Sequence, residues 1–133
     1  MSEIDYSHRT LLQKLGVKPE SRVSLLGVRD PNFLREILPQ VANPAQHRAA
    51  KESDLIFLGV ESEGQLKRLD PLKKYIVPKG AIWVIYPKGQ KHITQAQVMA
   101  AIKAAGLTDN KVCSFSETHT ALRACIPVAH RDA

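Results

Sequence analysis

Two short runs of the chain are almost wholly apolar, and they constrain the fold more than any other feature. Residues 55–60 read Leu-Ile-Phe-Leu-Gly-Val, and residues 81–86 read Ala-Ile-Trp-Val-Ile-Tyr. Both runs are far too short to cross a bilayer as helices. A strand covered by helices on both faces has this composition. The two runs therefore predict central strands of a buried parallel sheet.

Helical segments alternate with these apolar runs. Residues 7–15 carry leucines at helical spacing, with Ser7 as a cap, and a glycine follows them. Asp30 and Pro31 predict the start of a second helix, because an N-cap carboxylate accepts backbone N–H groups and proline suits the first turn. A capping box at Thr94 predicts the start of a further helix.

The segments between these elements are less regular. Leucines at helical spacing follow residues 55–60, and Pro71 divides them into two expected short helices, the second capped by Asp70. Residues 78–80, Pro-Lys-Gly, predict a turn. The sequence pattern of residues 41–51 predicts no element clearly, and a weak edge strand is the most that it suggests.

Further strands are expected at residues 23–28, 111–115 and 121–128, the last two joined by a turn around Glu117. Strands that alternate with helices favour a parallel sheet with helices on both faces. The expected fold is therefore α/β: a three-layer, Rossmann-like, mainly parallel sheet of five to six strands, closed by a C-terminal antiparallel hairpin.

The chain of 133 residues fits a single α/β domain, with residues 129–133 as a loose tail. Its first five residues carry two acids and no base, where a secretory signal would be basic, so we expect a cytoplasmic protein.

Cys113 and Cys125 lie in strand-like apolar segments and are expected to be buried thiols. The histidines are scattered without the spacing of metal ligands, and no metal site is expected.

Positive charge is concentrated in one window. Residues 64–91 contain seven Lys and Arg side chains against one acid, Asp70, and so account for the whole net charge of +6. Such a window can attract an anionic small molecule, an acidic protein or a nucleic acid. Its aromatic residues lie mainly in the apolar run 81–86 and do not alternate with the basic residues as platforms that stack on single strands do, so nucleic-acid binding is not expected.

Three segments carry a resemblance to a known family. They are Tyr6-Ser7 with Lys14-Leu15-Gly16, residues 83–88, and Lys111-Val112-Cys113 followed by Glu117-Thr118. The chain resembles a bacterial family known as domain of unknown function 3052, itself similar to a truncated class I methyltransferase fold. The resemblance implies the fold and no agreed activity. The family pattern has Trp where Tyr86 and His119 stand and Asp where Ser116 stands.

The first strand–helix loop argues against a standard cofactor site. Residues 27–32 contain one glycine, and Pro31 lacks an amide donor, whereas adenosyl and dinucleotide cofactors favour several glycines there. The stretch of chain between this loop and residue 55 is long enough for about one strand–helix unit, whereas a full methyltransferase has two such units there. We therefore expect no cofactor. Arg29, beside a helix N-terminus, is either a phosphate ligand or an ordinary exposed arginine.

Ligands of such sheets bind at the carboxyl ends of the parallel strands. The loop after residue 86 and the hairpin turn are expected at that edge, where Tyr86, Lys88, Glu117 and His119 would converge; a surface ion pair between Lys88 and Glu117 is the plainer alternative. The tentative ligand-binding residues are thus Arg29, Tyr86, Lys88, Glu117 and His119, and no catalytic residue is assigned.

Three functions remain open from the sequence. The first is a binding module for an anionic small molecule or a protein partner, built on a methyltransferase-like sheet that has lost its cofactor pocket. The second is an enzyme that uses S-adenosylmethionine or a nucleotide in an altered pocket. The third is weak nucleic-acid binding through the basic window.

Overall fold

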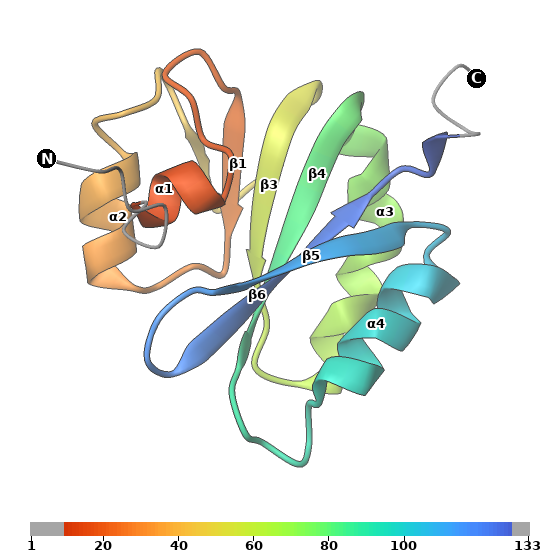
Figure 1. The fold of residues 1–133 in the computed structure, drawn as a ribbon. Coiled ribbons are helices and arrows are strands. Elements are labelled where there is room, and N and C mark those ends of the chain that lie inside the picture. The colour runs from red at the N-terminus through yellow and green to blue at the C-terminus, as the bar shows by residue number, and fades with distance from the viewer. Residues whose placement is uncertain (1–9, 129–133) are drawn as a thin grey trace, which may run out of the picture.

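The computed structural model describes residues 10–128 of the chain, and within them six strands form one sheet (Figure 1). The strands lie in the order β2-β1-β3-β4-β6-β5. Their bounds are β1 Val23–Leu26, β2 Ala45–Gln46, β3 Ser53–Gly59, β4 Ile76–Pro87, β5 Thr108–Ser114 and β6 His119–Cys125. The helical segments are α1 Leu11–Lys14, α2 Pro31–Ile37, η2 Glu63–Arg68, α3 Leu69–Leu72, η3 Lys73–Tyr75 and α4 Gln95–Ala104.

The strand directions confirm the predicted fold class. β1 pairs in parallel with β2 and with β3, and β3 pairs in parallel with β4. β6 runs antiparallel to both β4 and β5, which closes the sheet with a hairpin. The two-residue β2 supplies the weak edge strand suggested within residues 41–51.

Helices cover both faces of the sheet, as the two apolar runs require. In Figure 1, α1 and α2 lie on one side of the sheet, and α3 and α4 lie on the other. Each side has its own buried cluster of apolar side chains. Trp83 of β4 ties α1 to the sheet, because its indole Nε1 donates to the carbonyl oxygen of Leu15 at 3.0 Å.

Two predicted helix starts are confirmed in atomic detail. Oδ1 of Asp30 accepts the N–H groups of Asn32 and Phe33, and Pro31 occupies the first turn of α2. Thr94 and Gln97 form the predicted capping box of α4. The first helix is shorter than expected. α1 begins at Leu11 with a different cap, Thr10, while the predicted cap Ser7 and the tail 129–133 lie outside the described residues.

The prediction that Asp70 caps a separate helix is wrong. Residues 63–75 form one nearly continuous helical segment made of η2, α3 and η3, and Asp70 lies inside it. Pro71 is accommodated because it sits in the first turn of α3, where backbone N–H groups have few intrahelical partners.

The turn predicted at residues 78–80 is also wrong, because these residues belong to β4. The register advances two residues on β3, from Ser53 to Leu55, while β4 advances five, from Ile76 to Ala81. The extra residues form a bulge. Gly80 is needed there because a Cβ would lie 2.8 Å from the carbonyl oxygen of Asp54.

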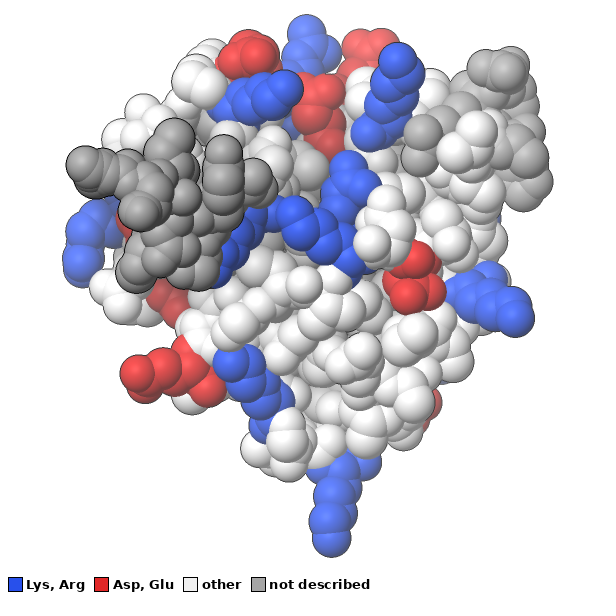
Figure 2. Space-filling view, viewed as in Figure 1, with Lys and Arg blue, Asp and Glu red and all other residues white. Residues whose placement is uncertain are grey.

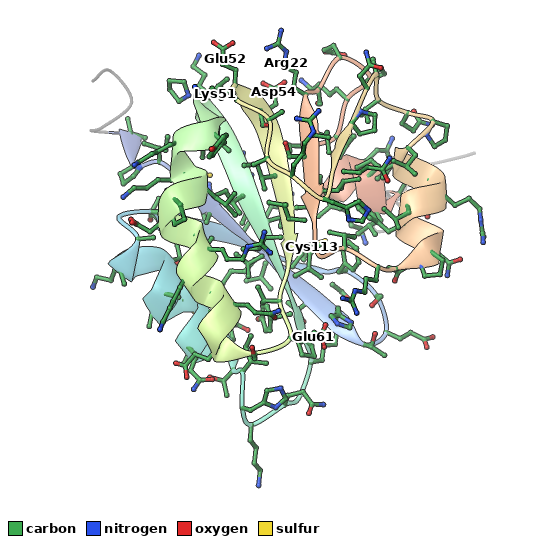
Figure 3. The ribbon with its side chains drawn as sticks, turned by 180° about the vertical axis from the view of Figure 1, so that it is seen from behind. Arg22, Lys51, Glu52, Asp54, Glu61 and Cys113 are labelled. Atoms are coloured by element: carbon green, nitrogen blue, oxygen red, sulfur yellow. The ribbon has the colours of Figure 1, made fainter. Side chains whose placement is uncertain are left out.

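The two ends of the sheet carry different side chains. Figure 3 shows Arg22, Glu52 and Asp54 together at one end, where Arg22 Nη1 lies 3.5 Å from Glu52 Oε1. Glu61 lies at the opposite end, beyond the carboxyl end of β3. Within residues 10–128, no helix has the length and apolar character needed to cross a membrane.

Candidate ligand-binding cavity

The carboxyl ends of β1 and β3 meet at two glycines. Leu26 pairs with Leu58, so Gly27 and Gly59 follow at matching positions on adjacent strands. Gly27 has a φ of +67°, and a Cβ on it would lie 2.7 Å from the carbonyl oxygen of Gly59. Side chains are therefore excluded from both positions, and the two backbones border an open space beyond the strands.

A cavity of about 640 Å³ occupies this space, within the range of about 300–1,000 Å³ that is usual for small-molecule sites. It is bordered by the loops after β1 and β3, by η2, by β4 and by the turn between β5 and β6. Its apolar wall is made by Val28, Ile85 and Phe115.

Four formally charged side chains line the cavity: Arg29, Asp30, Glu61 and Arg68. Within residues 10–128, neither arginine is in an ion pair with an acid. The Asp30 carboxylate is occupied in part by capping α2. Because the formal charges cancel, the cavity suits a ligand that carries both signs of charge better than a polyanion.

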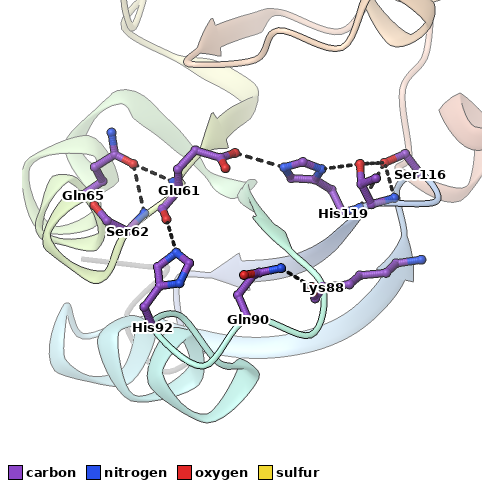
Figure 4. Close-up of polar contacts among 9 residues, drawn as sticks. Glu61, Ser62, Gln65, Lys88, Gln90, His92, Ser116 and His119 are labelled. Atoms are coloured by element: carbon purple, nitrogen blue, oxygen red, sulfur yellow. Dashed lines mark hydrogen bonds and ion pairs between the residues drawn. The ribbon is translucent and has the colours of Figure 1, made fainter.

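Glu61 is held from several sides (Figure 4). Its backbone N–H donates to Oε1 of Gln65 at 2.6 Å, and its carbonyl oxygen lies 2.9 Å from Nε2 of His92. Its carboxylate Oε2 lies 3.0 Å from Nε2 of His119, whose Nδ1 lies 2.8 Å from Oγ1 of Thr118. The β3–η2 loop and the hairpin turn are thus joined across the cavity.

Comparisons with known proteins give similarity in structure alone. No family model matches the chain, and no curated protein matches it by sequence. A SAM-dependent methyltransferase from Aquifex aeolicus matches with a TM-score of 0.62 and 15% identity over 88% of each chain. A TehB-like SAM-dependent methyltransferase from Corynebacterium glutamicum matches with 0.58 and 9%, over 88% of this chain and 85% of the other.

CalO1, a methyltransferase of calicheamicin biosynthesis in its SAH-bound form, matches with a TM-score of 0.64 and 16% identity, over 88% of this chain and 52% of CalO1. The chain has the fold of the class I SAM-dependent methyltransferases. The cavity described above lies at the carboxyl ends of the parallel strands of this methyltransferase fold, the edge at which α/β sheets bind ligands.

The expectation that the chain takes no cofactor is overturned. The solved structures that share its methyltransferase fold include SAM-dependent enzymes, and PigF and CalO1 are described with SAH. The expectation rested on one glycine in the loop after β1. In the structure a second glycine, Gly59, comes from the neighbouring strand, so two loops together leave the backbone open.

The tentative site residues separate into two places in the methyltransferase fold. Arg29 and His119 line the same cavity. Tyr86 and Lys88 border a different hollow of about 370 Å³, formed with the loop that follows β4. Glu117 is exposed on the hairpin turn. That these residues bind a ligand stays a prediction.

The interactions of Tyr86 and Lys88 explain this separation. Lys88 Nζ donates to Oγ of Ser114 at 2.8 Å, and within the described residues it forms no ion pair with Glu117. Tyr86 packs into the cluster beneath α4, and its burial raises the pKa of the phenol.

Sequence reasoning missed Gly59, Glu61, Gln65 and Arg68, all of which line the cavity. One signal was available. Residues 26–28 and 58–60 both read Leu-Gly-Val and both end a buried strand. A repeat of this kind at two strand ends indicates that the two glycines face each other if the strands are neighbours. The loop after the second glycine then belongs to the same site.

The basic window does not form one surface in this fold. Lys79 lies in the bulge near the start of β4, whereas Lys88 follows the end of the same strand, so the sheet separates them. On the face in Figure 2, Lys and Arg side chains are found at several separate places, with acids between some of them. For the part of the chain that is described, no group of three or more His, Cys, Asp or Glu residues is placed to hold a metal ion.

Proposed function

We propose that this chain binds S-adenosylmethionine, or its demethylated product S-adenosylhomocysteine, in the cavity beyond β1 and β3. One observation carries the proposal: paired glycines at the carboxyl ends of two adjacent parallel strands open onto a cavity of about 640 Å³ in a methyltransferase fold. This is the position at which the backbone of an α/β sheet approaches a ligand without interference from Cβ atoms.

The charges of the cavity support this ligand. S-Adenosylmethionine carries a sulfonium and an ammonium group together with a carboxylate. Arg29 and Arg68 provide partners for the carboxylate, and Asp30 and Glu61 provide partners for the two cations. Carboxylates can also accept the hydroxyl groups of a ribose. The residues that follow β2, His47 and Arg48, are not acidic, so the carboxylates that the cavity offers to a ribose are again Asp30 and Glu61.

The resemblance to the bacterial family of unknown function 3052 is kept as part of this proposal. It rests on the three sequence segments given above, and the methyltransferase fold of the chain supports it at the level of the fold. Membership of this family and binding of S-adenosylmethionine are separate questions, and a titration decides whether the ligand binds.

Isothermal titration calorimetry with S-adenosylhomocysteine tests the proposal. We expect a Kd in the micromolar range, weakened about tenfold in Arg68→Gln, which is a loss of about 1.4 kcal/mol. Lys67→Gln is the matched control, because it removes one positive charge from the adjacent exposed position outside the cavity. Its affinity should equal that of the unmodified chain.

Two results would contradict the proposal. One is the absence of binding at millimolar S-adenosylhomocysteine. The other is an equal loss of affinity in Arg68→Gln and Lys67→Gln. Binding of inorganic phosphate that depends on Arg68, without binding of S-adenosylhomocysteine, would instead favour a site for an anionic small molecule.

A further inference from the structure

The hairpin turn beside the cavity contains a line of polar groups that runs from Ser116 to Glu61. Ser116 Oγ accepts the backbone N–H groups of Thr118, at 3.3 Å, and His119, at 3.1 Å. Its hydroxyl hydrogen then points to Oγ1 of Thr118, which lies 3.3 Å away. A hydroxyl has one hydrogen to donate and can accept two, so Ser116 is the donor to Thr118.

The direction of the remaining hydrogen bonds follows from the same count. Glu61 as a carboxylate can only accept, so Nε2 of His119 must carry the hydrogen that joins them at 3.0 Å. Neutral imidazole then has its lone pair on Nδ1. Thr118 Oγ1, 2.8 Å from Nδ1, donates its hydrogen to that lone pair.

This arrangement is a carboxylate that orients an imidazole, with the imidazole acting as acceptor for a hydroxyl. Sites that activate a hydroxyl have this order of groups. Both Thr118 and His119 line the cavity, and Thr118 is exposed. Thr118 therefore lies where a bound molecule can reach a hydroxyl that is already directed at a base.

We propose that Thr118 and His119 form a proton relay that deprotonates a phenol bound in the cavity. The proposal rests on the proposed function, because S-adenosylmethionine is the methyl donor. The O–H bond of the phenol breaks as its proton passes to Thr118 Oγ1, while Thr118 passes its own proton to Nδ1 of His119.

The other half of the reaction completes the balance of atoms and charge. The phenol oxygen bonds to the methyl carbon as the sulfonium C–S bond breaks. The products are an aryl methyl ether and S-adenosylhomocysteine, whose sulfur is then an uncharged thioether. The resulting imidazolium is stabilised by the Glu61 carboxylate and later loses its proton to water.

The cavity wall favours an aromatic acceptor. Val28, Ile85 and Phe115 line it, and the ring of Phe115 is fixed against that of Phe33 at a centroid distance of 4.8 Å. A flat ring packs well against such a surface. The charged groups that face the relay are Glu61, which contacts the imidazole, and Arg29, Asp30 and Arg68, which share the cavity.

Nitrogen NMR of the His119 ring tests the relay without any ligand. In the neutral imidazole we expect the proton on Nε2, with Nδ1 as a hydrogen-bond acceptor. Thr118→Val should shift the Nδ1 resonance towards that of an unbonded nitrogen, and Thr120→Val, a neighbouring threonine that does not line the cavity, should leave it unchanged. A ring protonated on Nδ1 would overturn the relay.

Turnover with two phenols tests the acceptor class. The probes are 4-methylphenol, which ionises near pH 10 as tyrosine does, and 4-nitrophenol, which ionises near neutral pH without help. With S-adenosylmethionine present, we expect 4-methylphenol methylation to fall about 100-fold in His119→Asn and Thr118→Val. The loss with 4-nitrophenol should stay below about threefold, and Thr118→Ser, which keeps the hydroxyl, should restore turnover of 4-methylphenol.

The outcomes separate the two proposals. All variants are compared at saturating S-adenosylmethionine, and the affinity for S-adenosylhomocysteine is measured separately in each, so that a loss of binding is not counted as a loss of the relay. Equal losses on both phenols would reduce Thr118 and His119 to structural residues, and binding of S-adenosylhomocysteine without turnover of either phenol would overturn the acceptor class. A chain that fails to bind S-adenosylhomocysteine contradicts the proposed function, and the ring NMR then decides the relay alone.

Discussion

Gly27 and Gly59 approach each other so closely that a Cβ atom on Gly27 would lie 2.7 Å from the carbonyl oxygen of Gly59. Gly27 also has a φ of +67°, a conformation that strains other residues. Gly27→Ala should therefore lower the free energy of unfolding by about 2 kcal/mol or more, measured by urea denaturation. Gly64→Ala is the control, because nothing lies within 4 Å of its added Cβ, and its change should stay within about 0.5 kcal/mol. Equal effects of the two substitutions would contradict the close approach.

A second prediction concerns the link between α1 and the sheet. Trp83 is buried, and its Nε1 donates to the carbonyl oxygen of Leu15. Trp83→Phe keeps an aromatic ring but leaves that carbonyl without its donor, which costs about 1–3 kcal/mol. We expect a lower urea midpoint and faster hydrogen exchange in residues 11–15. Unchanged exchange in that segment would show that Trp83 does not hold α1.

A third prediction concerns a pair of buried hydroxyls between β1 and β3. Oγ of Ser24 and Oγ of Ser53 lie 2.8 Å apart, and both side chains are buried. Ser24 Oγ also accepts the N–H of Ala50, and Ser53 Oγ donates to the carbonyl oxygen of Ala50. Each single change to alanine should cost about 1–3 kcal/mol, because it leaves a buried polar group unpaired.

The double variant distinguishes a shared network from two independent contacts. Because the two serines bond to one another and both bond to the backbone of Ala50, the double change should cost less than the sum of the single changes. Strict additivity in urea denaturation would contradict this network.

A fourth prediction concerns alkaline pH. Burial raises the pKa of Cys113 above its ordinary value of 9.0, although the positive charges of Lys14 and Lys111 oppose the shift. At pH values below the ordinary pKa, the thiol is protonated in both folded and unfolded chains and stability is unaffected. As pH rises through that value, the unfolded chain releases the proton first, so the free energy of unfolding falls.

Chemical denaturation across this pH range checks the sign of the Cys113 effect. Cys113→Ala should unfold more easily at neutral pH, because a packed side chain is truncated, but should show a shallower decline above about pH 9. Tyr86, whose pKa burial also raises, would account for the part of the decline that remains. A decline that is identical with and without Cys113 would contradict its contribution.

Much of the fold could be predicted from the sequence because its signals are local. The apolar runs marked β3 and β4, and Asp30 and Thr94 marked helix starts that the structure confirms. The bulge at residues 78–80 was missed for a physical reason. Pro-Lys-Gly is typical of turns, and only the pairing with β3 shows that the strand continues through it.

The candidate site was less predictable because its residues come from separate loops. Arg29 and His119 line one cavity at the edge that the sequence predicts for them, since the carboxyl ends of parallel strands share that edge. Glu61 was not singled out, because its contact with His119 joins positions 58 residues apart in the chain. Tyr86 lies at the same end of the sheet but does not line this cavity, and a strand of unknown register does not reveal which face receives a given side chain.

The most direct test of the central claim is an amide NMR titration with S-adenosylhomocysteine, which reports where the ligand binds. We expect the largest chemical-shift changes at Gly27, Gly59 and Thr118, around the cavity. The amides of Lys91 and Gln95, beside the other hollow at the same end of the sheet, should stay in place. Shifts confined to those two residues, or no shifts at millimolar ligand, would contradict the claim that the cavity beyond β1 and β3 is the binding site.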